Sequence, residues 1–155
     1  MTSRCSWATI LSSAALVVSL TGQPASGGAP TQGGGVSVWD GVYTEEQATR
    51  GKAAYRKECA SCHMEDLRGE GYAAPLIADA FTQRWQDGTL GDLFTSLKAT
   101  MPADRPSVLE NEAYADIVAY LLKMNEYPAG QQELSKDPND LRPIVFKKPG
   151  VAAKP

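Results

Sequence analysis

Two cysteines and the chain's only histidine stand together in the sequence Cys59-Ala60-Ser61-Cys62-His63. Thiols at this spacing can form thioether bonds to the two vinyl groups of one haem, and the adjacent imidazole can reach the iron from the same side. Because the whole chain has only three cysteines, the pattern is a specific one. It predicts the covalent attachment of one haem c through Cys59 and Cys62, with His63 as an axial ligand of the iron.

A redox-active dithiol and a zinc site are the two alternatives for these residues. A thioredoxin-like CxxC normally follows a strand within an alternating strand and helix pattern, which this sequence lacks. A zinc site would need a further ligand. No second cluster of cysteine and histidine supplies one, since Cys5 lies in the N-terminal segment. Both alternatives are therefore weaker than haem attachment.

The sixth ligand of the iron cannot be a second histidine of this chain, because His63 is the only one. Methionine is the usual alternative. Met64 adjoins His63 and cannot easily reach the opposite haem face, and Met124 ends a helical pattern. Met101 precedes Pro102, which disfavours helical geometry and predicts an extended loop that can present the thioether. Met101 is therefore the predicted second metal ligand.

The N-terminal residues 1–27 are predicted to be a signal peptide, with a positive start at Arg4 and a mostly apolar run that follows. The protein is then exported to the periplasm; an uncleaved segment would instead tether it to the membrane. We expect a glycine-rich flexible leader at residues 28–38, a folded domain at residues 39–127, and a partly loose C-terminal extension at residues 128–155.

Composition limits the classes of partner. The 155 residues are 43% apolar and 21% charged, with a net charge of −3. Such a balance favours neither nucleic-acid binding nor a polybasic membrane surface. No membrane span is expected in the mature chain.

Helical periodicity predicts an all-α fold, with three main helices and no run of alternating strand residues. The first helix follows a capping threonine at Thr44, with Gln47 placed to reach back to the cap, and runs to the cysteines. The second follows Thr89 and ends near Thr100. The third spans Asn111 to Met124, and a short helix is possible around Ala78 to Trp85. Gly51 lies mid-helix at a cost of about 1 kcal/mol, which predicts a close helix crossing there.

These residues resemble the class I cytochromes c, especially short bacterial members found beside periplasmic dehydrogenases. Residues 51–55 (GKAAY) resemble the glycine and aromatic of the family's first helix, and residues 116–121 (DIVAYL) resemble its last helix. The resemblance implies three to four helices wrapped around one covalently bound haem. It also implies that Ile117 and Tyr120 cross the first helix at Gly51 and Tyr55.

The resemblance extends to residues that would surround the haem. Thr100-Met101-Pro102 looks like the family's axial-methionine loop. Pro75 matches the proline whose carbonyl accepts a hydrogen bond from the proximal histidine; an ordinary loop proline is the alternative. Trp85 and Arg84 could bond the haem propionates by analogy, or be a packed tryptophan and a solvated arginine. Met64 departs from the pattern, because many relatives have glycine there.

The implied function is one-electron transfer between redox proteins, such as a periplasmic dehydrogenase and a terminal oxidase, by a monomer or weakly bound subunit that is not itself an enzyme. A haem subunit of a larger periplasmic oxidoreductase is one alternative. A five-coordinate haem peroxidase or gas-binding protein is another. Four basic residues close to the haem motif could steer a docking partner or be ordinary solvated charges: Lys52, Arg56, Lys57 and Arg68.

Overall fold

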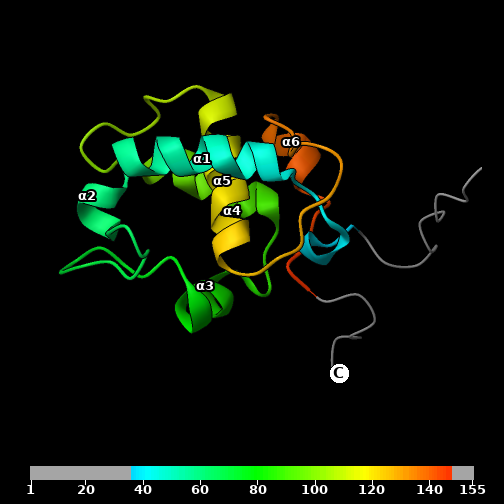
Figure 1. The fold of residues 1–155 in the computed structure, drawn as a ribbon, viewed down its shortest axis with the longest axis horizontal. Coiled ribbons are helices and arrows are strands. Elements are labelled where there is room, and N and C mark those ends of the chain that lie inside the picture. Colours follow the sequence, from blue (N-terminus) through cyan, green and yellow to red (C-terminus); the bar gives the residue numbers. More distant parts are fainter. Residues whose placement is uncertain (1–35, 148–155) are drawn as a thin grey trace, which may run out of the picture. The chain divides into compact units, whose positions relative to one another are not determined.

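The computed structural model describes residues 36–147, and within this range the fold is helical (Figure 1). The predicted all-α class is confirmed. The predicted signal peptide and residues 28–35 of the predicted leader lie outside the described residues, as do residues 148–155. No helix within residues 36–147 is long and apolar enough to cross a membrane. The elements are the 3-10 helix η1 (Val38–Asp40), α1 (Glu45–Glu58), α2 (Ala60–His63), α3 (Ala78–Trp85), α4 (Leu90–Thr100), α5 (Asn111–Met124) and α6 (Pro138–Leu141).

Local capping explains where the two helices that follow threonines begin. The Thr44 hydroxyl accepts a hydrogen bond from the backbone N–H of Gln47 at 3.1 Å, which satisfies one free donor at the start of α1. Thr89 and Asp92 form a reciprocal capping box at the start of α4. The prediction that the Gln47 side chain reaches back to its own cap is wrong, because its amide is occupied elsewhere, as described below.

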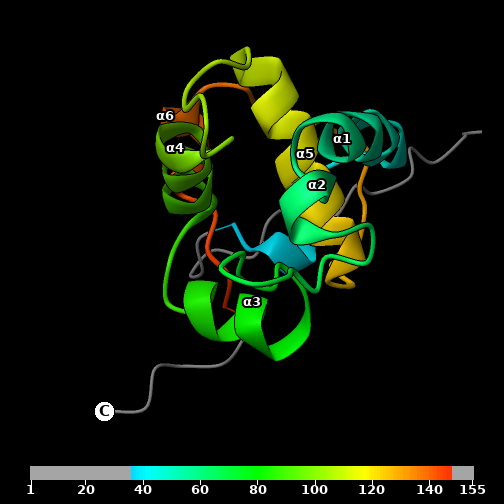
Figure 2. The same cartoon turned by 90° about the vertical axis from the view of Figure 1, so that its left-hand side faces the viewer.

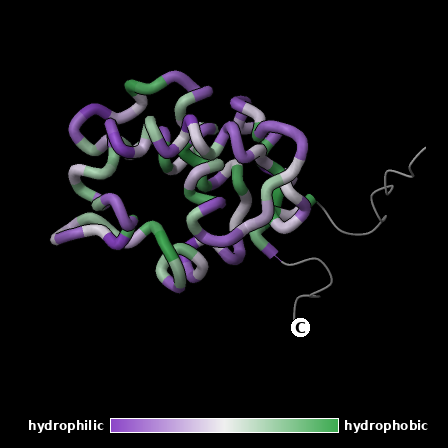
Figure 3. The backbone as a smooth tube through the Cα atoms, viewed as in Figure 1, coloured by the Kyte–Doolittle hydropathy of each residue, from purple (hydrophilic) through white to green (hydrophobic). Residues whose placement is uncertain are grey.

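Helix α5 is the centre of the fold, with α1 on one side and α4 on the other (Figure 2). All of its residues from Tyr114 to Leu122 are buried. Neighbouring segments therefore cover this helix on more than one side. Figure 3 shows apolar residues in the middle of the fold, where α5 runs, and hydrophilic residues along much of the outside.

The predicted close crossing at Gly51 is confirmed. A Cβ at this position would lie 1.8 Å from the carbonyl oxygen of Asp116 and 3.0 Å from the Cβ of Tyr120. The rings of Tyr55 and Tyr120 pack 5.3 Å apart between centroids. Only glycine allows the two helices to approach this closely, which accounts for its unfavourable place within a helix.

Residues 128–147, the described part of the predicted C-terminal extension and here called the C-terminal segment, pack onto the helices. The Gln47 side-chain amide donates to the carbonyl of Leu134 at 3.0 Å and accepts from its N–H at 2.7 Å. Two hydrogen bonds therefore fix the segment to α1 at Leu134. Arg50 of α1 pairs with both Asp116 and Glu133. Phe146 packs edge-on against Phe81 of α3.

The end of the predicted leader also belongs to the fold. The N–H of Val38 donates to the carbonyl of Val145 at 3.0 Å, and the N–H of Val145 donates to Val36 at 2.9 Å. Val38 is fully buried. Residues 36–38 are therefore held by the C-terminal segment, a contact over more than a hundred residues that sequence periodicity does not reveal.

Candidate haem attachment site

The two cysteines and the histidine occupy one short turn directly after α1. Cys59 caps the C-terminus of α1, and its carbonyl accepts hydrogen bonds from the N–H groups of Cys62 at 3.1 Å and His63 at 2.9 Å. Cys62 is exposed and Cys59 is half-buried, and both are free thiols. Cys59 at the N-cap of α2, and Cys62 and His63 within α2, thus bring two free thiols and the imidazole into one short segment, as attachment of a single haem requires.

The His63 ring is held by the loop that follows it. His63 is 7% exposed, and its Nδ1 lies 2.9 Å from the carbonyl oxygen of Ala74. A carbonyl can only accept, so Nδ1 carries the proton and Nε2 is the nitrogen left for a metal. The expectation that Pro75 supplies this carbonyl is wrong by one residue. Pro75 itself is exposed and follows the acceptor in the chain.

Backbone contacts fix the loop from residue 64 to residue 76 beneath His63. The hydroxyl of Tyr55 donates to the Met64 carbonyl at 2.7 Å, which ties the loop's start to α1. The N–H of Gly69 returns to the His63 carbonyl at 3.1 Å, and the N–H of Leu76 bonds the Leu67 carbonyl at 2.8 Å. Leu67 is fully buried. The Ala74 carbonyl is therefore presented by an ordered loop with an apolar anchor.

Met64 adopts an unusual backbone conformation in this loop, with φ 61° and ψ 161°. This region is sterically accessible mainly to glycine, so a methionine here carries backbone strain. The departure from the family pattern noted in the sequence therefore has a structural counterpart. The sequence predicted a helix crossing at Tyr55 and a departure from the family pattern at Met64. It did not predict the hydrogen bond of the Tyr55 hydroxyl or the backbone strain at Met64.

The environment of Cys59 favours the neutral thiol. Burial raises its pKa to about 11, with smaller contributions from the negative charge of Glu58 and from Cys62. A redox-active dithiol or a zinc thiolate needs the opposite shift. Within residues 36–147, no three histidine, cysteine or acidic side chains converge as a metal cluster would require. The donor set fits thioether attachment better than either alternative.

Met101 directly follows α4 in the extended conformation that Pro102 predicts, with φ −129° and ψ 148°. The side chain is half-buried. The hydroxyl of Tyr114, from the central helix α5, donates to the Met101 carbonyl at 2.7 Å and holds its backbone in place. Met64 is 37% exposed beside His63, whereas Met124 packs against the core at the end of α5. Ligation of iron by Met101 stays a prediction.

Trp85 and Arg84 lie in the last turn of α3. The Arg84 guanidinium lies over the Trp85 ring, 5.1 Å from its centroid, and Trp85 packs partly against the core. A contact between these residues and haem propionates stays a prediction.

The basic residues near the motif are largely neutralised by neighbours. Arg56 pairs with Glu65 at 2.9 Å, Lys57 with Glu58 at 3.1 Å, and Arg68 with Asp66 at 3.4 Å. Each of these three cations has a carboxylate within contact distance. The attraction that these cations exert on a distant partner is correspondingly weaker. They are therefore better described as ordinary exposed surface charges than as a docking patch.

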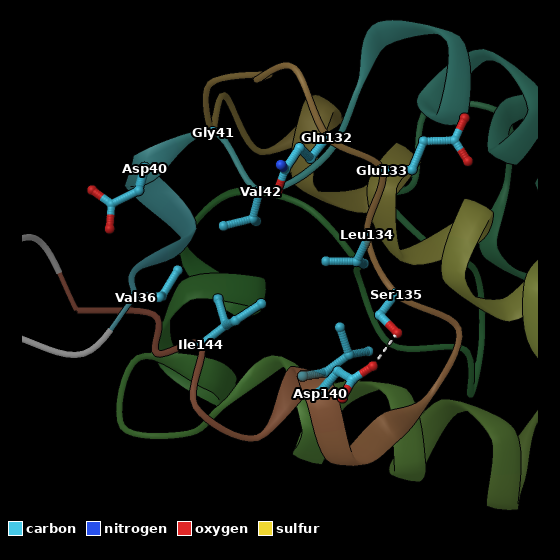
Figure 4. Close-up of a pocket in the computed structure, with 11 residues that line it drawn as sticks. Val36, Asp40, Gly41, Val42, Gln132, Glu133, Leu134, Ser135, Asp140 and Ile144 are labelled. Carbon is cyan, nitrogen blue, oxygen red and sulfur yellow. Dashed lines mark hydrogen bonds between the residues drawn. The ribbon is translucent and has the colours of Figure 1, made fainter. Parts of the chain in front are cut away.

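A cavity of about 310 Å³ lies elsewhere, between η1 and the C-terminal segment (Figure 4). Its three carboxylates are already engaged, since Asp140 accepts a hydrogen bond from Ser135, Asp40 accepts one from the N–H of Ser37, and Glu133 pairs with Arg50. None of the predicted site residues lines it. The lining residues are Val36, Asp40, Gly41, Val42, Gln132, Glu133, Leu134, Ser135, Asp140, Leu141 and Ile144.

One comparison with known proteins bears on this site. Residues 46–121, which include α1, the cysteine turn, Met101 and most of α5, match the family model described as cytochrome C oxidase, cbb3-type, subunit III. Searches of curated proteins and of solved structures gave no match.

Proposed function

Residues 46–121 are a c-type cytochrome domain, and we propose that the protein is a one-electron carrier with a single haem c bound to Cys59 and Cys62. The observation that carries the proposal is the arrangement of His63. Its ring is buried, its Nδ1 is anchored to the Ala74 carbonyl at 2.9 Å, and its position follows two free thiols. A hydrogen bond of this kind fixes ring orientation and raises the basicity of the coordinating nitrogen.

Met101 is the proposed partner of His63 on the iron. It lies in an extended segment whose carbonyl is tied to Tyr114, and the chain has no second histidine. A thioether with a fixed backbone changes its position little between two oxidation states. The haem, when bound, supplies an iron that accepts and releases one electron, and Met/His ligation raises its reduction potential.

The redox partners follow from the location we propose for the protein. Export through the predicted signal peptide would place it in the periplasm, between an electron donor such as a dehydrogenase and an acceptor such as a terminal oxidase. Because three of the four nearby basic residues are paired with acids, we expect recognition to depend more on a small contact surface than on long-range attraction. Such interfaces are small and transient.

A second candidate function is that of a haem subunit in a larger oxidoreductase. The family description favours it, because it names a subunit of an oxidase. Co-purification of stoichiometric membrane or dehydrogenase subunits with the native protein would support the subunit function, whereas a free monomer that exchanges electrons in solution would support the carrier. A five-coordinate enzyme is the third possibility, and rapid carbon monoxide binding by the unmutated protein would favour it.

Replacement of Met101 tests the proposed ligation. The ferric protein should show the weak long-wavelength absorption band of sulfur-to-iron charge transfer, and Met101→Ala should abolish it and lower the potential. Met124→Ala is the matched control, since this methionine belongs to the core, and should retain the band. A band that survives in Met101→Ala would show that another group is the ligand.

A further inference from the structure

The loop that carries Met101 is held to the cysteine segment by an ion pair. Arg105 lies four residues after Met101, and its Nη2 donates to Oε2 of Glu58 at 2.5 Å. Glu58 is the last residue of α1 and directly precedes Cys59. Two segments that are far apart in the sequence, one bearing the predicted distal ligand and one bearing the haem attachment, therefore meet at this contact.

The two partners differ in their exposure. The Glu58 side chain is 6% exposed, whereas that of Arg105 is 48% exposed. The hydrogen bond from Arg105, reinforced by one from Lys57, lowers the pKa of Glu58 below its usual value. Because the Glu58 carboxylate is shielded from water, its attraction to Arg105 is screened less than the attraction between two solvent-exposed side chains.

Within residues 36–147, the other hydrogen bonds of residues 101–110 run within the loop or to α4 and α5. The N–H and hydroxyl of Ser107 both bond the carbonyl of Lys98, and the N–H of Arg105 bonds the Pro102 carbonyl. Tyr114 holds Met101 from α5. Among residues 36–147, these contacts fix the loop to itself and to its flanking helices. Figure 1 shows this loop, drawn in yellow-green between α4 and α5, near the end of α1 that leads to α2.

We propose that Glu58 and Arg105 form a clamp that positions the Met101 loop over the haem and so sets how readily Met101 leaves the iron. This inference rests on the proposed function, because it assumes that Met101 is the ligand. Both residues are positioning residues, since they act through the loop. The ion pair joins the loop to the segment that would carry the covalently attached haem, so breaking the pair removes one link that holds the loop there.

The affinity of the ferric protein for added imidazole measures loop opening. Imidazole competes with methionine for the iron, so its apparent affinity rises as Met101 becomes easier to displace. Arg105→Ala should raise the imidazole affinity about tenfold, an effect between those of exposed and buried ion pairs. Glu58→Gln should act in the same direction, and the double variant should add little to either single one. Arg105→Lys, which keeps the charge, should stay closer to the unmutated protein.

Arg56→Ala is the matched control, because it removes an arginine of the same end of α1 whose partner, Glu65, lies outside the Met101 loop. It should change imidazole affinity less than twofold. Urea unfolding of every variant distinguishes loop opening from a general loss of stability. If Arg105→Ala folds poorly, Glu58→Gln and Arg105→Lys still test the ion pair.

Two results would overturn the clamp, and they are distinguishable. If the charge-transfer band depends on Met101 but Arg105→Ala and Glu58→Gln bind imidazole as the unmutated protein does, the ligation stands and the clamp is wrong. If the unmutated protein lacks the band and Met101→Ala leaves its spectrum and potential unchanged, Met101 is not the ligand. In that case the proposed ligation by Met101 and the proposed clamp both fail.

Discussion

Replacing Gly51 with alanine should destabilise the domain by about 2 kcal/mol, although alanine is the better helix former. The added Cβ would lie 1.8 Å from the Asp116 carbonyl oxygen, whereas ordinary contacts begin near 3.4 Å. The helices would have to separate by about 1.6 Å at the crossing. Helix α5 cannot recede freely, because its residues from Tyr114 to Leu122 are buried.

The magnitude is the difference between two opposing effects. Overpacking of a well-packed contact costs about 1 to 3 kcal/mol, and here the clash is with backbone rather than with a movable side chain, so the upper part of that range applies. Alanine recovers about 1 kcal/mol of helix propensity. The net loss of about 2 kcal/mol lowers the urea midpoint by roughly 1 M at a typical slope.

Urea unfolding of the haem-loaded protein, followed by circular dichroism, measures this change. Ala53→Gly is the control for propensity alone, because Ala53 is exposed on the same helix, and it should cost about 1 kcal/mol. A Gly51→Ala protein that is as stable as the unmutated one, or more stable, would refute the close crossing of α1 and α5.

Two further substitutions test the extension and the loop beneath His63. Gln47→Ala should lower the free energy of unfolding by about 2 kcal/mol, because it leaves the buried N–H and carbonyl of Leu134 unpaired. It should also make residues 128–147 more sensitive to protease. The exposed Gln132→Ala is the control, and equal protease sensitivity in both variants would count against the pairing. Met64→Gly should raise the free energy of unfolding in urea by about 1 kcal/mol, because glycine accepts the conformation at φ 61° without strain. A clear loss of stability would show that the contacts of the methionine side chain stabilise the protein by more than its backbone strain destabilises it.

Local signals in the sequence predicted the helices well. Thr44 and Thr89 marked the starts of α1 and α4, and Pro102 marked the end of α4. The bounds predicted for α5 agree with those observed. Caps, proline and hydrophobic period all act over a few residues, so they can be read directly from the chain. Gly51 even indicated a tertiary contact, because glycine destabilises the interior of a helix and a close helix crossing explains its presence there.

Contacts between distant segments escaped sequence reasoning. Gln47 suited a local capping box, yet its amide pairs with Leu134, 87 residues away. The carbonyl that meets His63 belongs to Ala74 rather than Pro75, since the path of the intervening loop depends on positive φ values at Met64 and Leu67. Hydrophobic periodicity and capping signals indicate neither contact. The contact between Arg105 and Glu58 is of the same kind, as nothing in either segment's composition indicates the other.

Intact-mass spectrometry of the protein, produced in cells that attach haem to exported cytochromes, tests the central claim most directly. The protein should be heavier than its Cys59→Ala/Cys62→Ala variant by the mass of one haem, after allowance for the two substitutions, and the haem should resist extraction by acidified organic solvent. A mass equal to that of the bare polypeptide, or haem that extraction removes, would contradict attachment at Cys59 and Cys62.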